Sequence, residues 1–220
     1  MASAMQFHDR EQAGRELAGR LRFEQEKGML TDPVVLALPR GGVTVAQEVA
    51  AALGAPLDVL VVRKIGVPYE EELGVGAIVG DDEPLFDERA LEHLGLGEPE
   101  LAPVVERERA ELHRRERLYR QGHPAPDLRD RTVIVVDDGL ATGSTARAAL
   151  RFVRRRKPAR VVLAVPVGSP EATHRLRAEA DEVLCLQQPP AFLAVGNCYE
   201  EFEQLTDDDV LRALDTTTEH

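Results

Sequence analysis

A chain of 220 residues, 43% of them hydrophobic, is long enough for one sizeable α/β domain with an appended subdomain. Its net charge of −12 argues against a surface that wraps nucleic acid or anionic lipid, so no nucleic-acid partner is expected. Cys185 and Cys198 fit neither a disulfide framework nor a metal-binding pattern. The first residues lack the regions of a signal peptide and no apolar run of about 18 residues spans a membrane, so we expect a cytoplasmic protein.

Strand and helix patterns alternate along the chain. Continuous apolar runs are typical of strands buried on both faces, and runs with apolar residues every three or four positions are typical of helices. The expected elements, in chain order, are a helix over 9–28, a strand over 34–38, a helix over 43–53, a strand over 57–62, a strand over 75–79, helices over 87–94 and 98–121, a strand over 132–136, a helix over 144–156, a strand over 160–165, a helix over 170–179 and a strand over 182–186.

This alternation, with short connections, predicts an α/β fold: a doubly wound, mostly parallel sheet with helices on both faces. We expect a single domain over residues 1–220. Its core covers about 30–187, and a small cap, or hood, is formed by about 1–29 and 188–215.

Two adjacent acids follow the most apolar strand. Asp137 and Asp138 come directly after residues 132–136, and ligands of open α/β sheets bind at the carboxyl ends of the strands. A tight turn over 139–143 follows, and Ser144 opens a helix whose first turn presents unpaired N–H groups and the positive end of the helix dipole. The segment suits a ligand with a vicinal diol and a phosphate, such as a ribose 5-phosphate.

The segment from Val133 to Thr145 reads as an apolar strand followed by D-D-x-x-x-T-G-x-T, and it resembles the signature of type I phosphoribosyltransferases. In that family the two acids bind the ribose hydroxyls and the turn binds the 5′-phosphate. The resemblance implies ribose-binding, catalytic roles for Asp137 and Asp138. It implies 5′-phosphate binding by Ala141, Thr142, Gly143, Ser144 and Thr145. Gly139 departs from the pattern, because the family more often has an aliphatic residue there.

Other interpretations of this segment have less support. The chain has no GxxxxGK[ST] motif, which a Walker B strand would require as its partner. Gly74, Gly76 and Gly80 are spaced one residue too widely for a dinucleotide-binding fingerprint. A strand that ends in a solvated acidic turn is the plain structural alternative.

A second loop follows the strand over 34–38. Arg40, Gly41 and Gly42 combine a guanidinium with glycine N–H groups, which suits a polyanion. In the family the equivalent loop binds pyrophosphate, often through a non-proline cis peptide, so the resemblance implies pyrophosphate binding by these three residues. An ordinary turn between a strand and a helix is the alternative.

Arg63 and Lys64 close the strand expected over 57–62. Two cations at a strand end are costly unless an anion meets them. Related enzymes carry a similar basic pair before a mobile lid, which implies pyrophosphate binding by Arg63 and Lys64 and a lid over about 65–80. A salt-bridged surface pair is the alternative.

The helix over 98–121 carries arginines interleaved with glutamates, which is typical of a solvated face, with a contact across an oligomer interface as the alternative. The arginines are Arg107, Arg109, Arg114, Arg115, Arg117 and Arg120.

The stretch over 190–200 resembles the base-binding hood of hypoxanthine and guanine phosphoribosyltransferases, with Phe192 as the stacking aromatic and Glu200 as the acid. Those enzymes also need a Lys after the late core strand, where this chain has only Pro166 to Ser169. An oxygen acceptor left without its donor costs about 1–3 kcal/mol. We therefore expect an acceptor that is not a 6-oxopurine held in their manner.

The PRGG, VRK and DDGxATG motifs together resemble a subgroup of small bacterial phosphoribosyltransferase-like proteins. The resemblance implies transfer of a 5-phosphoribosyl group from phosphoribosyl pyrophosphate to a nitrogenous base or related nitrogen acceptor. It implies Mg²⁺ held by substrate oxygens, without direct protein ligands, and a homo-oligomer with no membrane partner. The alternative is a non-catalytic regulator that senses phosphoribosyl pyrophosphate.

Overall fold

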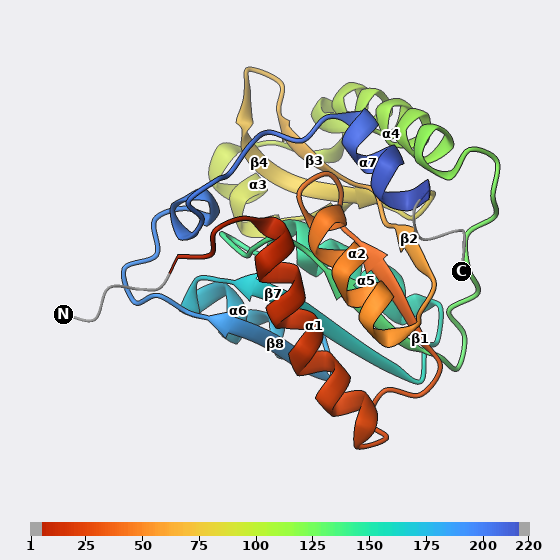
Figure 1. The fold of residues 1–220 in the computed structure, drawn as a ribbon. Coiled ribbons are helices and arrows are strands. Elements are labelled where there is room, and N and C mark those ends of the chain that lie inside the picture. Colours follow the sequence, from red (N-terminus) through yellow and green to blue (C-terminus); the bar gives the residue numbers. More distant parts are fainter. Residues whose placement is uncertain (1–5, 216–220) are drawn as a thin grey trace.

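The computed structural model describes residues 6–215, apart from the side chains of residues 71 and 72 (Figure 1). The helices are α1 (Arg10–Glu26), α2 (Gly42–Leu53), α3 (Glu88–Leu94), α4 (Glu98–Arg120), α5 (Ser144–Arg155), α6 (Pro170–Leu176), α7 (Asp207–Asp215) and a 3₁₀ helix (Val195–Cys198). The strands are β1 (Pro33–Ala37), β2 (Leu57–Val59), β3 (Val62–Val67), β4 (Glu70–Val79), β5 (Leu85–Phe86), β6 (Thr132–Val136), β7 (Arg160–Val167) and β8 (Glu182–Gln187).

The main sheet has five parallel strands in the order β2-β1-β6-β7-β8. Side chains alternate between its faces, as the pleat of a strand requires. Along β6, Ile134 packs with α1 and α2, whereas Val133 and Val135 pack with α5 and α6. Every residue of β6 is buried, so both faces of the strand are covered. The predicted doubly wound parallel sheet is confirmed.

Residues 62–86 differ from the expectation. The second core strand ends at Val59 rather than continuing to 62, and β3, β4 and β5 form a separate three-stranded antiparallel sheet. The prediction that 63–82 contains only one strand was wrong. Glycines and a β-bulge beside Gly66 interrupt the alternation that would have indicated β3. The hairpin packs between α4 and α5, and its closing over a ligand stays a prediction.

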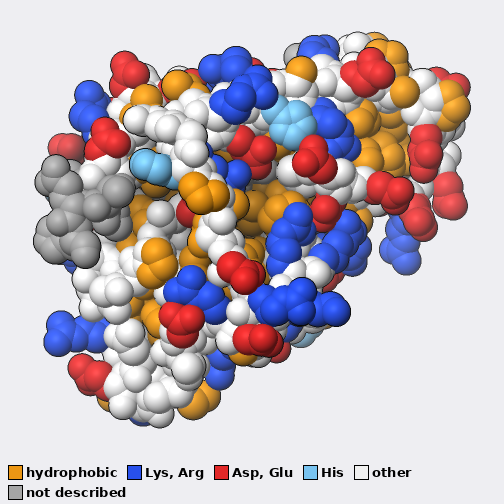
Figure 2. Space-filling view, turned by 90° about the vertical axis from the view of Figure 1, so that its right-hand side faces the viewer, with side chains coloured by type: hydrophobic (Ala, Val, Ile, Leu, Met, Phe, Trp, Pro, Cys, Tyr) orange, Lys and Arg blue, Asp and Glu red, His pale blue; other side chains and the backbone are white. Residues whose placement is uncertain are grey.

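The N-terminal segment pairs with a segment near the C-terminus. Phe7 pairs with Tyr199 in a short parallel bridge, and α1 packs along α2. The segment after Tyr199 then returns to α7, which contacts both α2 and α4 (Figure 1). No helix in this described part of the chain combines the length and the apolar composition needed to cross a membrane. The face drawn in Figure 2 carries acidic and basic side chains interspersed rather than a patch of one sign.

Candidate functional site

The loops after β1 and β6 meet because these strands are parallel neighbours, with Ala37 opposite Val136. A Cβ placed on Gly41 would lie 2.0 Å from Oδ2 of Asp138, and one on Gly42 would lie 2.7 Å from the carbonyl oxygen of Val136. Both positions therefore require glycine. The structure brings the predicted pyrophosphate loop against the predicted ribose-binding acids.

Arg40 of this loop contacts the C-terminal segment. The Pro39–Arg40 peptide bond is cis, as the resemblance led us to expect for this loop. The half-buried Arg40 donates a hydrogen bond from Nη1 to the carbonyl of Leu205 at 2.9 Å. The C-terminal segment thereby fixes the loop's guanidinium above the sheet edge.

The turn after β6 is open at its tip. Gly143 has φ +77°, which favours glycine, and it precedes α5 without a side-chain cap. The hydroxyls of Thr142 and Ser144 lie 3.1 Å apart, and both residues are exposed. The first N–H groups of α5 are therefore available to an anion at the positive end of the helix.

Gly139 departs from the family pattern for a reason that the structure shows. A Cβ at this position would lie 2.6 Å from Cγ1 of Val195, which belongs to the 3₁₀ helix of the C-terminal stretch. The space that an aliphatic side chain would fill is already occupied by Val195. The departure is thus coupled to the packing of that stretch on the turn.

Asp138 forms a buried ion pair that sequence reasoning missed. Nε of Arg10 donates to Oδ2 of Asp138 at 2.9 Å, and the two side chains are only 9% and 14% exposed. Nη1 of Arg10 donates to the carbonyl of Glu203 at 2.9 Å, and its guanidinium lies 3.9 Å from the ring centre of Phe202. Oδ2 of Asp138 is therefore already engaged by Arg10.

The two acids are in different electrostatic situations. Burial raises the pKa of Asp137 well above its ordinary value, and the neighbouring charge of Asp138 raises it further. Burial also raises the pKa of Asp138, but the charge of Arg10 opposes that shift. Oδ1 of Asp137 accepts the backbone N–H of Asp138 at 2.9 Å. Arg10 therefore favours the ionised form of Asp138 more directly than that of Asp137.

A family model described as a phosphoribosyl transferase domain matches residues 3–202. The chain belongs to this family. It is 45% identical over 209 residues to a Mycobacterium tuberculosis protein provisionally named a phosphoribosyl transferase, and the match covers 95% of this chain but 46% of that protein. The chain therefore spans about half the length of the curated relative that it matches.

Two solved structures are similar to this chain in fold. The Thermus thermophilus protein TT1426 is 44% identical, with a TM-score of 0.80 over 96% of this chain and 98% of that one. A hypoxanthine phosphoribosyltransferase from Staphylococcus aureus has a TM-score of 0.51 at 11% identity, over 87% of this chain and 79% of that one. The second likeness shows the shared fold alone.

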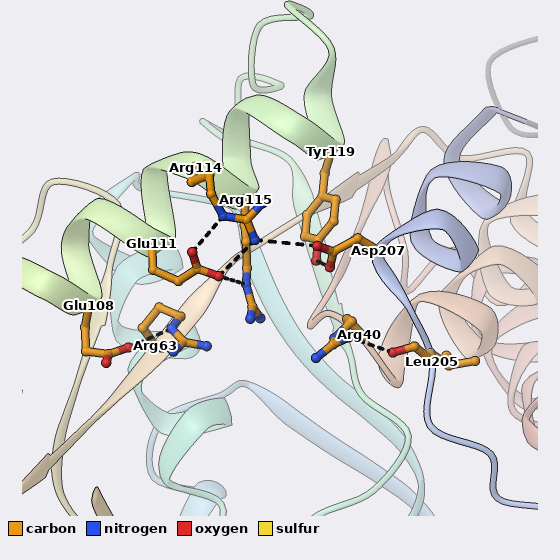
Figure 3. Close-up of polar contacts among 9 residues, drawn as sticks. All are labelled: Arg40, Arg63, Glu108, Glu111, Arg114, Arg115, Tyr119, Leu205 and Asp207. Atoms are coloured by element: carbon orange, nitrogen blue, oxygen red, sulfur yellow. Dashed lines mark hydrogen bonds and ion pairs between the residues drawn. The ribbon is translucent and has the colours of Figure 1, made fainter.

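In this phosphoribosyl transferase family member, Arg63 and Lys64 do not lie at the end of a strand of the main sheet. The prediction that Arg63 and Lys64 close the second strand was wrong, because both lie within β3. Arg63 donates from Nε and Nη2 to Oε2 of Glu108 at 2.9 and 2.6 Å, and Lys64 is exposed. Figure 3 shows Arg63 below α4, on the side that also faces Arg40. Pyrophosphate binding by the pair stays a prediction.

The predicted base-binding residues lie in the cap. Phe192 is half-buried and packs on a small apolar cluster that contains Val167 and Tyr199. The side chain of Glu200 is 58% exposed and accepts from Nδ1 of His8 at 2.9 Å. Tyr199 donates its hydroxyl to the carbonyl of Asp138 at 2.6 Å, so this stretch reaches the end of β6 through Tyr199.

Several arginines of α4 hold the fold together. Arg109 donates to the carbonyls of Gly80 and Asp82, and Arg120 binds Asp58 with its side chain only 20% exposed. The prediction of a solvated face was therefore wrong for these positions. Alternating charge along a helix is typical of a solvent-exposed face. Only the packing of β2 and the hairpin on α4 reveals the partners of these arginines.

Proposed function

We propose that this chain transfers a 5-phosphoribosyl group from phosphoribosyl pyrophosphate to a nitrogen of a small acceptor and releases pyrophosphate. One observation carries the proposal: the Gly41–Gly42 loop lies directly against Asp138. The loop proposed to bind the polyanion and the acids proposed to bind the diol thus share one sheet edge, beside the open first turn of α5.

The chemistry follows from these positions. Asp137 and Asp138 would accept hydrogen bonds from the ribose hydroxyls and hold the ring in place. The bond from C1 to the pyrophosphate oxygen breaks, and its electron pair leaves with pyrophosphate. C1 passes through an oxocarbenium-like state before the acceptor nitrogen forms the new bond and loses its proton to solvent. The carboxylates favour the positive charge that develops on the ring.

We propose that Mg²⁺ enters as part of the substrate, chelated by diphosphate and ribose oxygens, because it keeps several waters and rarely needs a protein cage. Among residues 6–215, leaving out the side chains of residues 71 and 72, no three His, Cys, Asp or Glu side chains are grouped to hold a metal. Asp137 and Asp138 would bind the ribose hydroxyls, and the substrate oxygens would hold the ion. The bound ion would neutralise charge on the leaving pyrophosphate.

The acceptor is proposed to be a nitrogenous base other than a 6-oxopurine held in the manner of the hypoxanthine and guanine enzymes. The turn after β7 contains Ser169 and no Lys, and the hydroxyl of Ser169 donates to the carbonyl of Ala141 at 2.8 Å. The Ser169 hydroxyl therefore already donates its proton to the turn after β6. A base oxygen at this place would lack the Lys that those enzymes use.

The test is pyrophosphate release with Mg²⁺, phosphoribosyl pyrophosphate and a panel of nitrogenous acceptors, with Asp137→Asn as the control for site-dependent turnover. Release with at least one acceptor, lost in the variant, would support transfer. Tight binding of phosphoribosyl pyrophosphate without release for any acceptor would instead identify a sensor. Preferred turnover of hypoxanthine or guanine would contradict the acceptor proposal.

A further inference from the structure

Arg115 of α4 extends toward the pyrophosphate loop. Its Nε donates to Oε1 of Glu111 at 2.7 Å, and the side chain is only 18% exposed. Figure 3 shows its guanidinium below α4, between Arg63 on one side and Arg40 on the other. The sequence pattern assigned Arg115 to a solvated face, and the structure instead turns it inward.

Each of the three arginines is held by an acceptor of its own. Glu108 of α4 binds Arg63, Glu111 of α4 binds Arg115, and the carbonyl of Leu205 binds Arg40. At the other end of the helix, the hydroxyl of Tyr119 donates to Asp207 at 2.6 Å. Such fixed guanidiniums are preorganised, because little side-chain freedom is lost when they bind an anion.

The arginine side chains in this region have fewer carboxylates than they need to neutralise their charge. Glu111 is shared by Arg114 and Arg115, and these hydrogen bonds lower the pKa of Glu111 to about 2. Arg40 donates to the backbone carbonyl of Leu205, which supplies no counter-charge. The pKa of Asp207 is lowered first by the hydrogen bond from Tyr119 and then by the charges of Arg115 and Arg40. The charges of Arg115 and Arg40 therefore both act on Asp207.

Partly buried, incompletely neutralised guanidiniums that converge on one space are typical of an anion site. We propose that Arg115 is a third diphosphate-binding arginine, supplied by α4 beside Arg40 of the loop and Arg63 of the hairpin. The assignment rests on the proposed function and extends it to a helix outside the main sheet. A planar guanidinium can bind phosphate oxygens in pairs, which a point charge cannot do.

The experiment is calorimetric titration of the full chain with Mg²⁺ and three probes: phosphoribosyl pyrophosphate, inorganic pyrophosphate and ribose 5-phosphate. Arg115→Gln keeps an N–H donor for Glu111 but removes the charge. Arg114→Gln is the matched control, because Arg114 binds the same Glu111 and is 50% exposed. Because one charge-assisted contact is lost, Arg115→Gln should bind both diphosphate probes with an affinity about 10- to 100-fold lower. Ribose 5-phosphate binding, and all binding to Arg114→Gln, should stay within about twofold.

Equal pyrophosphate affinity in Arg115→Gln and the wild-type chain would overturn the assignment. An equal loss in Arg114→Gln would also overturn it, because the effect would then come from Glu111. Arg115→Lys, which retains charge, should recover part of the affinity. A wild-type chain that binds pyrophosphate but not phosphoribosyl pyrophosphate would refute the proposed function, and the pyrophosphate titration would still decide Arg115.

Discussion

At the scale of single residues, the pairing of Arg10 with Asp138 sets the electrostatics of the site. Replacing Arg10 with Met should lower the free energy of unfolding by about 3–5 kcal/mol, because Asp138 is left as a buried charge without a partner. Arg15→Met is the matched control on the same helix, since its pair with Glu11 is exposed and should cost under about 1 kcal/mol. Urea unfolding of both variants measures the difference. Equal losses in the free energy of unfolding would contradict a larger contribution from the Arg10 pair.

The two acids should respond differently to amide substitution. Asp137→Asn and Asp138→Asn should each lower turnover by about one to two decades, the equivalent of a lost charge-assisted bond of about 1.5–3 kcal/mol. Only Asp138→Asn should also destabilise the fold, because it deprives Arg10 of its counter-charge. Thermal unfolding alongside kinetics separates these effects, and a larger stability loss in Asp137→Asn would contradict the assignment.

The pH dependence of Asp137 has a definite sign. Its folded-state pKa is raised by burial and by Asp138, so the folded state favours the protonated form. The stability that this contributes is fully present below the ordinary carboxyl pKa and is lost as pH rises through the raised value. The stability of Asp137→Asn relative to wild type should therefore increase with rising pH across that window. A difference that does not change with pH would contradict the raised pKa.

At the scale of elements, the 3₁₀ helix packs closely against the turn after β6. Gly139→Ala should destabilise the fold by about 1–3 kcal/mol, because its Cβ would collide with Val195. Adding Val195→Ala should restore part of this loss, and a double-mutant cycle measures the coupling. Gly19→Ala in α1 is the control, since no atom lies within 4 Å of its added Cβ. Strict additivity of the two changes would exclude the proposed contact.

At the scale of the whole molecule, the C-terminal segment joins elements that are distant in the sequence. Glu203 binds Arg10 of α1, Leu205 binds Arg40 of the loop, and Asp207 binds Tyr119 of α4. Tyr119→Phe should lower stability by about 0.5–1.5 kcal/mol and increase amide hydrogen exchange over residues 199–215 while α5 stays protected. Tyr69→Phe is the control, because Tyr69 is 69% exposed. Exchange that rises equally throughout the chain would contradict a local role.

The sequence alone determined the parallel sheet and the positions of the acids, the glycine loop and the phosphate turn. These features are local: an apolar run dictates a buried strand, and the residues that follow it are carried to the same sheet edge. The hairpin was largely missed, because glycines and a bulge break its alternation.

Only the tertiary structure decided what surrounds that edge. Arg10 meets Asp138 across 128 positions and Arg63 meets Glu108 across 45, and no local pattern marks either pair. A charged residue on an amphipathic helix has the same sequence signature whether it faces water or a partner. The distinction depends on which elements pack against the helix, and long-range packing of α1, α4 and the C-terminal segment supplies it.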